Sequence, residues 1–326
     1  MLVFLIHGVA TQSVGYGDRF KKNVKEFLLQ ANREAGSTEY NNGQKNNPAI
    51  PVFYSSFWGH TFKNQTDQLF NWVRSDIKEI TTRHPDLKDK GHDIYRYQEL
   101  REDFIGKFFG DFLTYMHQEK GAEIRGQIFA QFQAFIRDHP QDREVIIVAH
   151  SLGTLILWDL LFAPDLPATD PAHLFRRCFQ TEPHPLELRG LVTMGSPLLL
   201  MKTKQDINFS TVNSNSLSGH APNSLVWLNL IHASDSVAYP LGSAIQHDCG
   251  QPCFLFMDQY IWQFGNFPEL SALGLGQMHA GMALGLMDAH NAYWGNEITA
   301  KLTALLIRRD TEALQKAQVH TGWRSF

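Results

Sequence analysis

Cysteine, excess charge and long apolar runs are scarce in this sequence, and each scarcity excludes a class of protein. Three cysteines among 326 residues are too few for a disulfide framework, so we expect reduced thiols. A net charge of -4 provides no basic surface for nucleic acid. No apolar run is long enough for a membrane span, and the short apolar stretch at the start has no basic residue before it, unlike a signal peptide. We therefore expect a cytoplasmic protein without a nucleic-acid partner or a transmembrane segment; transient contact with lipid and the oligomeric state remain open.

Potential metal ligands are also sparse. His247, Cys249 and Cys253 fall in one short stretch and could be drawn as three zinc ligands. No second nearby pair of Cys or His residues completes a tetrahedral set. We therefore expect no metal site and no cofactor.

The sequence does contain enough apolar material for one large core. Hydrophobic residues make up 43% of the chain and aromatic residues 12%, and no linker separates two independent patterns. Strand-like and helix-like segments alternate, which is typical of an α/β fold with a mostly parallel central sheet flanked by helices. We expect a single domain over 1–326 that has strands at 2–6, 51–57, 145–148, within 188–197 and from 226 to just before Asp235, helices at 18–31, 152–162 and 298–314, and polar loops at 36–48 and 210–218.

The stretch between the second and third strands is far longer than one crossover needs. We expect a helical insertion over 58–140, in which two helices pair through dense apolar faces. These faces are expected in the core, with a roof over the functional site as the alternative. Their members are Ile105, Phe108, Phe109, Phe112, Leu113 and Met116 for one helix, and Ile124, Ile128, Phe132, Phe135 and Ile136 for the other.

Residues 145–154 have a pattern that is typical of a nucleophilic serine in a sharp turn between a strand and a helix. Their sequence, Val-Ile-Ile-Val-Ala-His-Ser-Leu-Gly-Thr, predicts a buried strand, a sharp turn at the serine and a helix that starts at once. Ala149 and Gly153 are small where the strand and helix backbones crowd together. Because the turn is tight, we expect Ser151 to adopt a rarely populated backbone conformation with its hydroxyl within hydrogen-bond reach of His290.

A base and an orienting acid follow this serine in the chain. Asp235, in the turn after a strand, is the expected acid. The alternatives are that Asp235 is an ordinary exposed aspartate of a turn, and that Asp258 is the acid instead. His290, just before the closing helix, is the expected base, with His279 as the alternative. The order Ser151, Asp235, His290 is the one in which α/β-hydrolases present a catalytic triad.

At this point the chain resembles a known family. It is similar to the α/β-hydrolase superfamily, and within it to lipase-like serine esterases that carry an early His-Gly, a Gly-Ser-Pro and a late His-x-x-Tyr. Those motifs stand here at 7–8, 195–197 and 290–293, so the resemblance spans most of the chain. One departure is Ala149, which replaces the first glycine of Gly-x-Ser-x-Gly. The resemblance implies an α/β-hydrolase fold with helical insertions.

The resemblance also implies roles for residues around the serine. The backbone N–H groups of Val9 and Leu152 would form an oxyanion hole. Ser196, in the Gly-Ser-Pro turn, is expected to be structural. His7 and His150 flank the site, and we expect them to pack and to form hydrogen bonds rather than to act as bases.

The stretch between Asp235 and His290 is far longer than a strand needs. Its later part, 261–287, mixes apolar side chains with glycines, which suits a mobile lid or an acyl-chain pocket within 241–287. A buried connecting segment is the alternative. The side chains expected to contact the substrate are Met278, Met282 and Leu286.

Taken together, these residues predict acyl transfer. Ser151 would attack a carbonyl, His290 would accept and later return the proton, and Asp235 would orient His290. We expect a lipase-like or esterase-like serine hydrolase that acts on an ester or thioester with an apolar acyl group through an acyl-enzyme intermediate. The alternatives are an amidase or peptidase on the same triad, and a catalytically inactive binding protein with this fold.

Overall fold

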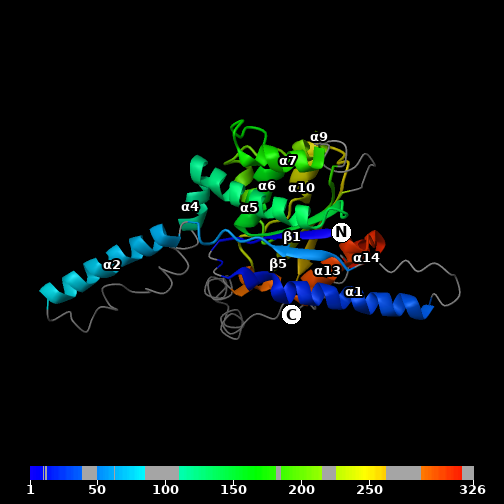
Figure 1. The fold of residues 1–326 in the computed structure, drawn as a ribbon, viewed down its shortest axis with the longest axis horizontal. Coiled ribbons are helices and arrows are strands. Elements are labelled where there is room, and N and C mark those ends of the chain that lie inside the picture. The colour runs from blue at the N-terminus through cyan, green and yellow to red at the C-terminus, as the bar shows by residue number, and fades with distance from the viewer. Residues whose placement is uncertain are drawn as a thin grey trace.

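The computed structural model describes residues 1–9, 11, 13–38, 50–61, 63–84, 110–180, 185–214, 225–261 and 288–317. Within them, six parallel strands form one sheet in the order β2-β1-β3-β4-β5-β6 (Figure 1). Because the strands are parallel, their carboxyl ends lie along one edge of the sheet. The strands are β1 (Leu2–Ile6), β2 (Val52–Ser55), β3 (Glu144–His150), β4 (Glu187–Met194), β5 (Val226–His232) and β6 (Leu255–Ile261).

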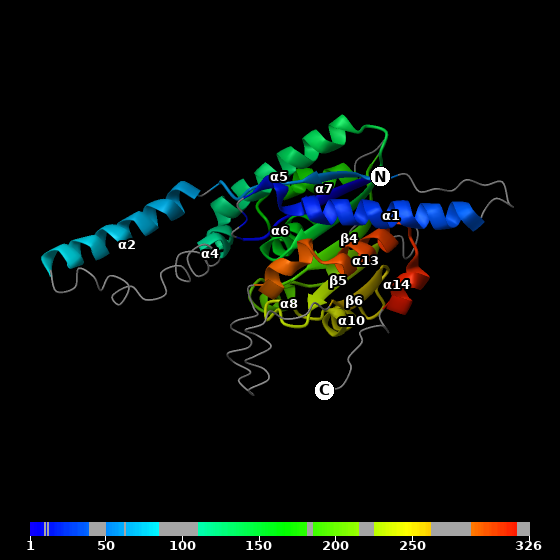
Figure 2. The same cartoon turned by 90° about the horizontal axis from the view of Figure 1, so that it is seen from below.

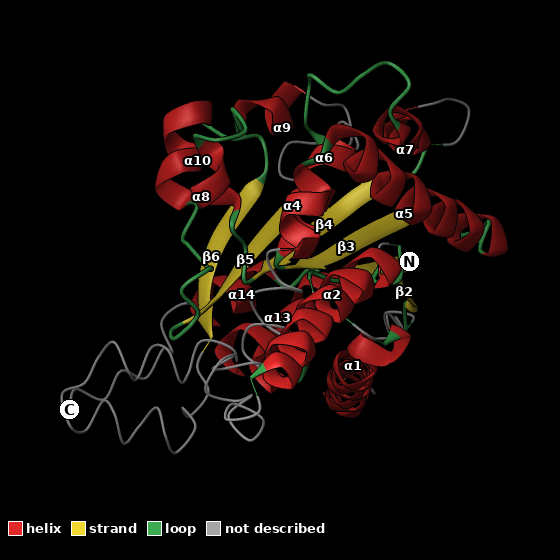
Figure 3. Ribbon diagram, turned by 90° about the vertical axis from the view of Figure 1, so that its left-hand side faces the viewer, coloured by secondary structure: helices red, strands yellow, loops and turns green. Residues whose placement is uncertain are grey.

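Helices cover both faces of this sheet (Figures 2 and 3). One face packs against α5 (Gln118–Asp138), α6 (Leu152–Leu161) and α7 (Pro171–Gln180). The other face packs against α1 (Asp18–Thr38) and α13 (Glu297–Ile307). Successive strand residues point into opposite cores, which explains why the strands are continuous apolar runs rather than alternating ones.

The shorter elements lie around this frame, and α2 extends away from the sheet (Figures 1 and 2). No helix in the described ranges combines the length and the apolar character that crossing a membrane requires. The remaining described elements are η1 (Val14–Gly17), α2 (Lys63–Arg83), α4 (Gly110–Met116), α8 (Leu198–Lys202), α9 (Ser210–Ser214), α10 (Gly242–Cys249), η5 (Ala292–Trp294) and α14 (Thr311–Ala317).

The expected fold class, a parallel α/β sheet with helical insertions, is confirmed. The stretch 58–140 contains α2, α4 and α5, and α5 packs directly on the sheet. Helices α4 and α5 contact each other as expected, although Leu113 of α4 is exposed rather than part of the shared apolar face. Residues 105–109 of that face lie outside the described residues.

Three local expectations were wrong. Helix α1 continues to Thr38, into the stretch 36–48 expected to be a loop. The expected loop at 210–218 begins with helix α9, because the Asn208 side chain accepts the Ser210 N–H and caps it. The single closing helix expected at 298–314 is two helices, because Arg309 adopts a positive φ of 59° and ends α13.

The segment 241–287, expected to contain a lid or pocket, begins with regular structure. Its first part is α10 followed by β6, the edge strand that pairs with β5. Residues 262–287, with Met278, Met282 and Leu286, lie outside the described residues. The contact of these three side chains with a substrate therefore stays a prediction.

A buried ion-pair network joins four helices on one face of the sheet. Arg125 of α5 is 3% exposed, and its Nε donates to Asp170 Oδ1 over 3.0 Å at the start of α7. Its Nη1 donates to the Tyr115 hydroxyl of α4 over 3.0 Å and to Asp159 of α6 over 3.3 Å. The Tyr115 hydroxyl in turn donates to Asp159. Arg125 therefore makes direct hydrogen bonds to two carboxylates that come from different parts of the chain.

Replacing Arg125 by Ala should lower the free energy of unfolding by about 3–5 kcal/mol, because Asp159 and Asp170 lose their shared cation. Urea denaturation of the purified variant measures this loss. Arg137→Ala is the matched control, since Arg137 is exposed on the same helix and its removal should change stability by about 0.5 kcal/mol or less. Equal, small losses in both variants would contradict a stabilising role for the network.

Candidate active site

The carboxyl edge of the sheet gathers the sequence-predicted residues. His7 and Gly8 follow β1, Ser151 follows β3, and Asp235 lies just beyond β5. His290 comes from the segment that precedes η5 and reaches the same edge. Residues far apart in the chain meet there because parallel strands end on the same side.

Ser151 forms the sharp turn between β3 and α6. Its backbone has φ 55° and ψ -130°, which confirms the expected rarely populated conformation. The Ser151 N–H donates to the Met194 carbonyl of β4 over 2.9 Å, and the Ser151 carbonyl accepts from the N–H and the hydroxyl of Thr154 over 2.9 and 2.8 Å. Such a conformation costs about 1–3 kcal/mol and persists because these contacts fix it.

Two glycines let the chain approach this turn. A Cβ at Gly8 would lie 2.4 Å from Ser151 Cβ, and one at Gly153 would lie 2.7 Å from the carbonyl oxygens of both Ile6 and His7. The end of β1 is thus in close contact with the turn at Ser151 and with the first turn of α6. Gly153 is small for the reason the sequence suggested.

The side chains of Ser151, His290 and Asp235 form a hydrogen-bonded chain. His290 Nε2 lies 2.7 Å from Ser151 Oγ, and His290 Nδ1 lies 2.9 Å from Asp235 Oδ2. All three residues are buried, with exposed fractions of 2%, 6% and 4%. The expected contact between the Ser151 hydroxyl and a histidine is therefore present.

Further donors hold the Asp235 carboxylate. The Tyr293 hydroxyl donates to Asp235 Oδ2 over 2.9 Å, and the Val237 N–H donates to Oδ1 over 2.9 Å. The same tyrosine hydroxyl accepts the His232 N–H over 2.8 Å. Burial by itself raises the pKa of Asp235, but the hydrogen bonds from His290, Val237 and Tyr293 outweigh it and lower that pKa below its ordinary value. The carboxylate is therefore held in its ionised form.

Asp258, the substitute acid, lies in β6 and has other partners. Its carboxylate accepts hydrogen bonds from Asn229 Nδ2 over 2.7 Å, from the Leu241 N–H over 3.0 Å and from the Gly242 N–H over 2.8 Å. These bonds join β5 and β6 to the start of α10. Asp235, not Asp258, is the carboxylate that faces His290, while His279 lies outside the described residues.

Two residues next to the site were not given specific contacts by the sequence. His150 Nε2 lies 2.6 Å from the His290 carbonyl oxygen, and the two rings are 4.8 Å apart. Burial lowers the pKa of His150 to about 3, so the ring is neutral and donates to that carbonyl. In the sequence, Tyr293 could be singled out only as the last residue of the His-x-x-Tyr motif. Both residues fix the segment that carries His290.

Of the predicted oxyanion donors, Leu152 directly follows Ser151, and Val9 follows Gly8, which is in close contact with Ser151. Leu152 is the first residue of α6, so the helix does not use its N–H. Among the hydrogen bonds of the described residues, none uses the Val9 N–H. Ser196, expected to be structural, shares a 3.0 Å hydrogen bond with the Thr154 hydroxyl and accepts the Leu198 N–H over 3.3 Å.

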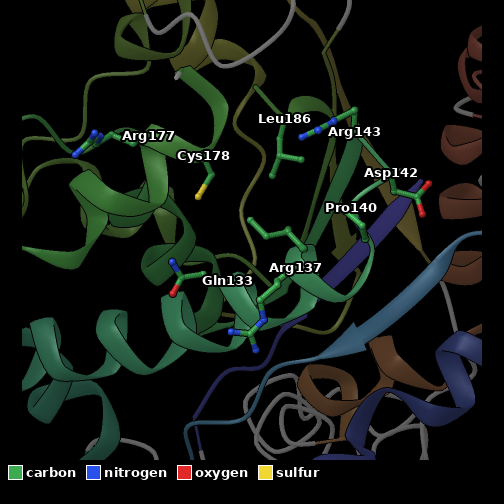
Figure 4. A pocket seen from close by; sticks show the side chains of 9 residues that line it. Gln133, Arg137, Pro140, Asp142, Arg143, Arg177, Cys178 and Leu186 are labelled. Carbon is green, nitrogen blue, oxygen red and sulfur yellow. The ribbon is translucent and has the colours of Figure 1, made fainter. Parts of the chain in front are cut away.

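A surface pocket is lined by residues that include Arg137, Cys178 and Leu186 (Figure 4). It lies at the other end of the sheet from Ser151. Asp142 and Arg143 line it and precede β3, whereas Ser151 follows that strand. A seven-residue strand spans roughly 20 Å. In the described ranges, no group of three or more His, Cys, Asp or Glu side chains is arranged to hold a metal ion.

Comparison with known proteins adds no relative: the chain matches no family model, no curated protein and no solved structure.

The close contact at Gly153 can be tested through stability. Gly153→Ala should lower the free energy of unfolding by about 1–3 kcal/mol, because the new methyl group would press on two backbone carbonyls that cannot move aside. Gly126→Ala is the matched control in α5, where the nearest atom is Pro171 Cγ at 3.4 Å. That change should raise stability by about 0.5–1 kcal/mol, as expected for glycine to alanine in a helix. Two changes of the same sign in thermal unfolding would contradict the close approach.

Proposed function

We propose that this protein is a serine hydrolase that cleaves carboxylic ester or thioester bonds through an acyl-enzyme intermediate. The observation that carries the proposal is the hydrogen-bonded chain from Ser151 Oγ through His290 to Asp235. A neutral serine hydroxyl is a weak nucleophile, and an adjacent imidazole is the group that activates it. The strained turn supports the same function because it presents Ser151 at the edge of the sheet.

Acylation begins when Ser151 Oγ attacks the substrate carbonyl and His290 Nε2 takes the hydroxyl proton. The carbonyl oxygen becomes negative, and the N–H groups of Val9 and Leu152 are the donors proposed to stabilise it. Each such donor is typically worth about 2.7–4 kcal/mol of transition-state stabilisation. His290 then returns the proton to the leaving alcohol or thiol.

Deacylation repeats these steps with water as the nucleophile. His290 accepts a proton from the attacking water and gives it back to Ser151 as the acid product leaves. Asp235 keeps its negative charge throughout, orients the imidazole through Nδ1 and stabilises the imidazolium. The lowered pKa of Asp235 and its bond from Tyr293 support this role.

A covalent probe tests whether Ser151 is the nucleophile. A fluorophosphonate should label the wild-type protein, and the label and ester turnover should both disappear in Ser151→Ala. Ser196→Ala is the matched control, because Ser196 is a buried serine at the same edge whose hydroxyl bonds Thr154 instead of a histidine. Labelling that survives in Ser151→Ala would contradict the proposal, and a wild type that never labels would favour an inactive binding protein.

The acid role of Asp235 has its own test. Asp235→Asn should preserve the fold and reduce kcat by roughly 10⁴, because an amide favours the wrong imidazole tautomer. Asp258→Asn should keep most of the activity, since Asp258 contacts Asn229 and the start of α10 rather than His290. Steady-state kinetics on a p-nitrophenyl ester and on the matching anilide measure both variants, and the anilide arm reveals any amidase activity. The opposite ranking would transfer the acid role to Asp258.

A further inference from the structure

His7 is a fully buried histidine beside the proposed triad, and the reaction described above does not use it. Its ring stacks on Trp58, with centroids 4.9 Å apart and planes 7° apart. Tyr16 and Phe57 pack around it at centroid distances of 5.1 Å each. A buried polar ring in an aromatic cage needs a reason to be a histidine rather than a phenylalanine.

The hydrogen bonds of His7 fix its protonation state. The backbone N–H of Trp58 donates to His7 Nε2 over 3.1 Å, so this ring nitrogen carries a lone pair and no proton. The proton is therefore on Nδ1, which donates to the Gly8 carbonyl oxygen over 2.7 Å. Burial lowers the pKa of His7 to about 4, in agreement with a neutral ring.

This second bond controls a peptide unit next to the nucleophile. The Gly8 carbonyl and the Val9 N–H belong to the same planar trans peptide, so they point in opposite directions. When the His7 ring holds the carbonyl on one side, the N–H must face the other side. Gly8 is in close contact with Ser151, since a Cβ there would lie 3.0 Å from Ser151 Oγ.

The chain after β2 anchors this arrangement. Trp58 Nε1 donates to the His7 carbonyl over 3.1 Å, in addition to the bond from its backbone N–H to the ring. A Cβ at Gly59 would lie 2.3 Å from the Thr11 carbonyl oxygen, so the two loops are in tight contact. The loop after β2 therefore holds the His7 ring and the backbone on both sides of the Gly8 peptide.

We propose that His7 is a positioning residue, whose Nδ1–H holds the Gly8 carbonyl so that the Val9 N–H points at the oxygen that becomes negative when Ser151 attacks. This inference rests on the proposed serine hydrolase function. In this role His7 does not contact the substrate. It stabilises the transition state indirectly, by orienting the Val9 N–H.

Three variants separate this role from simple packing. His7→Phe keeps an aromatic ring on Trp58 but removes both hydrogen bonds. His7→Asn puts an amide N–H where Nδ1 stands, so it can still donate to the Gly8 carbonyl, whereas His7→Gln reaches only the position of Nε2. Each variant is first checked for a native unfolding transition in urea, and the Asn and Gln pair decides the question among folded proteins.

The phenylalanine and glutamine variants should lose about 10²–10³-fold in kcat with KM nearly constant, which is the effect of losing one oxyanion donor. The inhibition constant of a boronic acid, which mimics the tetrahedral intermediate, should rise by a similar factor in the same variants. His7→Asn should recover most of both losses. A loss of stability alone would change neither the boronate affinity nor the split between kcat and KM.

Two results would overturn the inference while leaving the function intact. One is a His7→Gln enzyme with wild-type kcat. The other is an equal loss in all three variants with no change in boronate affinity, which would assign His7 to packing. A wild-type protein without any ester turnover would contradict the proposed function itself, and the two failures are therefore distinguishable.

Discussion

Ser151 is held at φ 55° where β3 passes into α6, and much of the surrounding chain is arranged so that this strained conformation can exist. The Met194 carbonyl fixes its N–H, Thr154 fixes its carbonyl, and two glycines give the end of β1 room beside it. The strain of about 1–3 kcal/mol is offset by the strand and helix on either side. Nearly every residue of β3 and α6 is buried, so the turn cannot relax without disturbing the core.

The parallel sheet explains how groups distant in the sequence converge on that turn. The ends of β1, β3 and β5 bring Gly8, Ser151 and the Asp235 loop to one edge. The histidine arrives from the far end of the chain and needs its own supports. His150 donates to its carbonyl, and Tyr293 connects the same segment to Asp235 and to the last residue of β5. The His290 imidazole is thus fixed both by the hydrogen bond of its ring to Asp235 and by the bonds that hold its backbone and Asp235 in place.

The sequence predicted the features that depend on neighbouring residues and missed several that depend on contacts between distant ones. The sharp turn at Ser151 could be predicted because an apolar strand, a serine and an immediate helix follow one another directly. The choice between Asp235 and Asp258 depended on which carboxylate faces His290. That contact is set by the tertiary structure and cannot be read from the spacing of residues in the sequence. Strand β6 was missed because Asp258 and Gln259 interrupt its apolar pattern, yet both are satisfied by partners, Gln259 through the Leu314 carbonyl. The break between α13 and α14 was missed because Arg309, not glycine, adopts the positive φ.

A nucleophilic Ser151 must become covalently acylated during turnover. Rapid mixing with excess p-nitrophenyl acetate, followed by acid quenching and mass spectrometry of peptides, detects this acyl group. We expect a burst approaching one p-nitrophenolate per protein chain, with one acetyl group on the peptide that contains Ser151 and none on that peptide in Ser151→Ala. Steady hydrolysis without a burst and without an acetylated Ser151 peptide, or acetylation of another residue at the same rate, would contradict a nucleophilic role for Ser151.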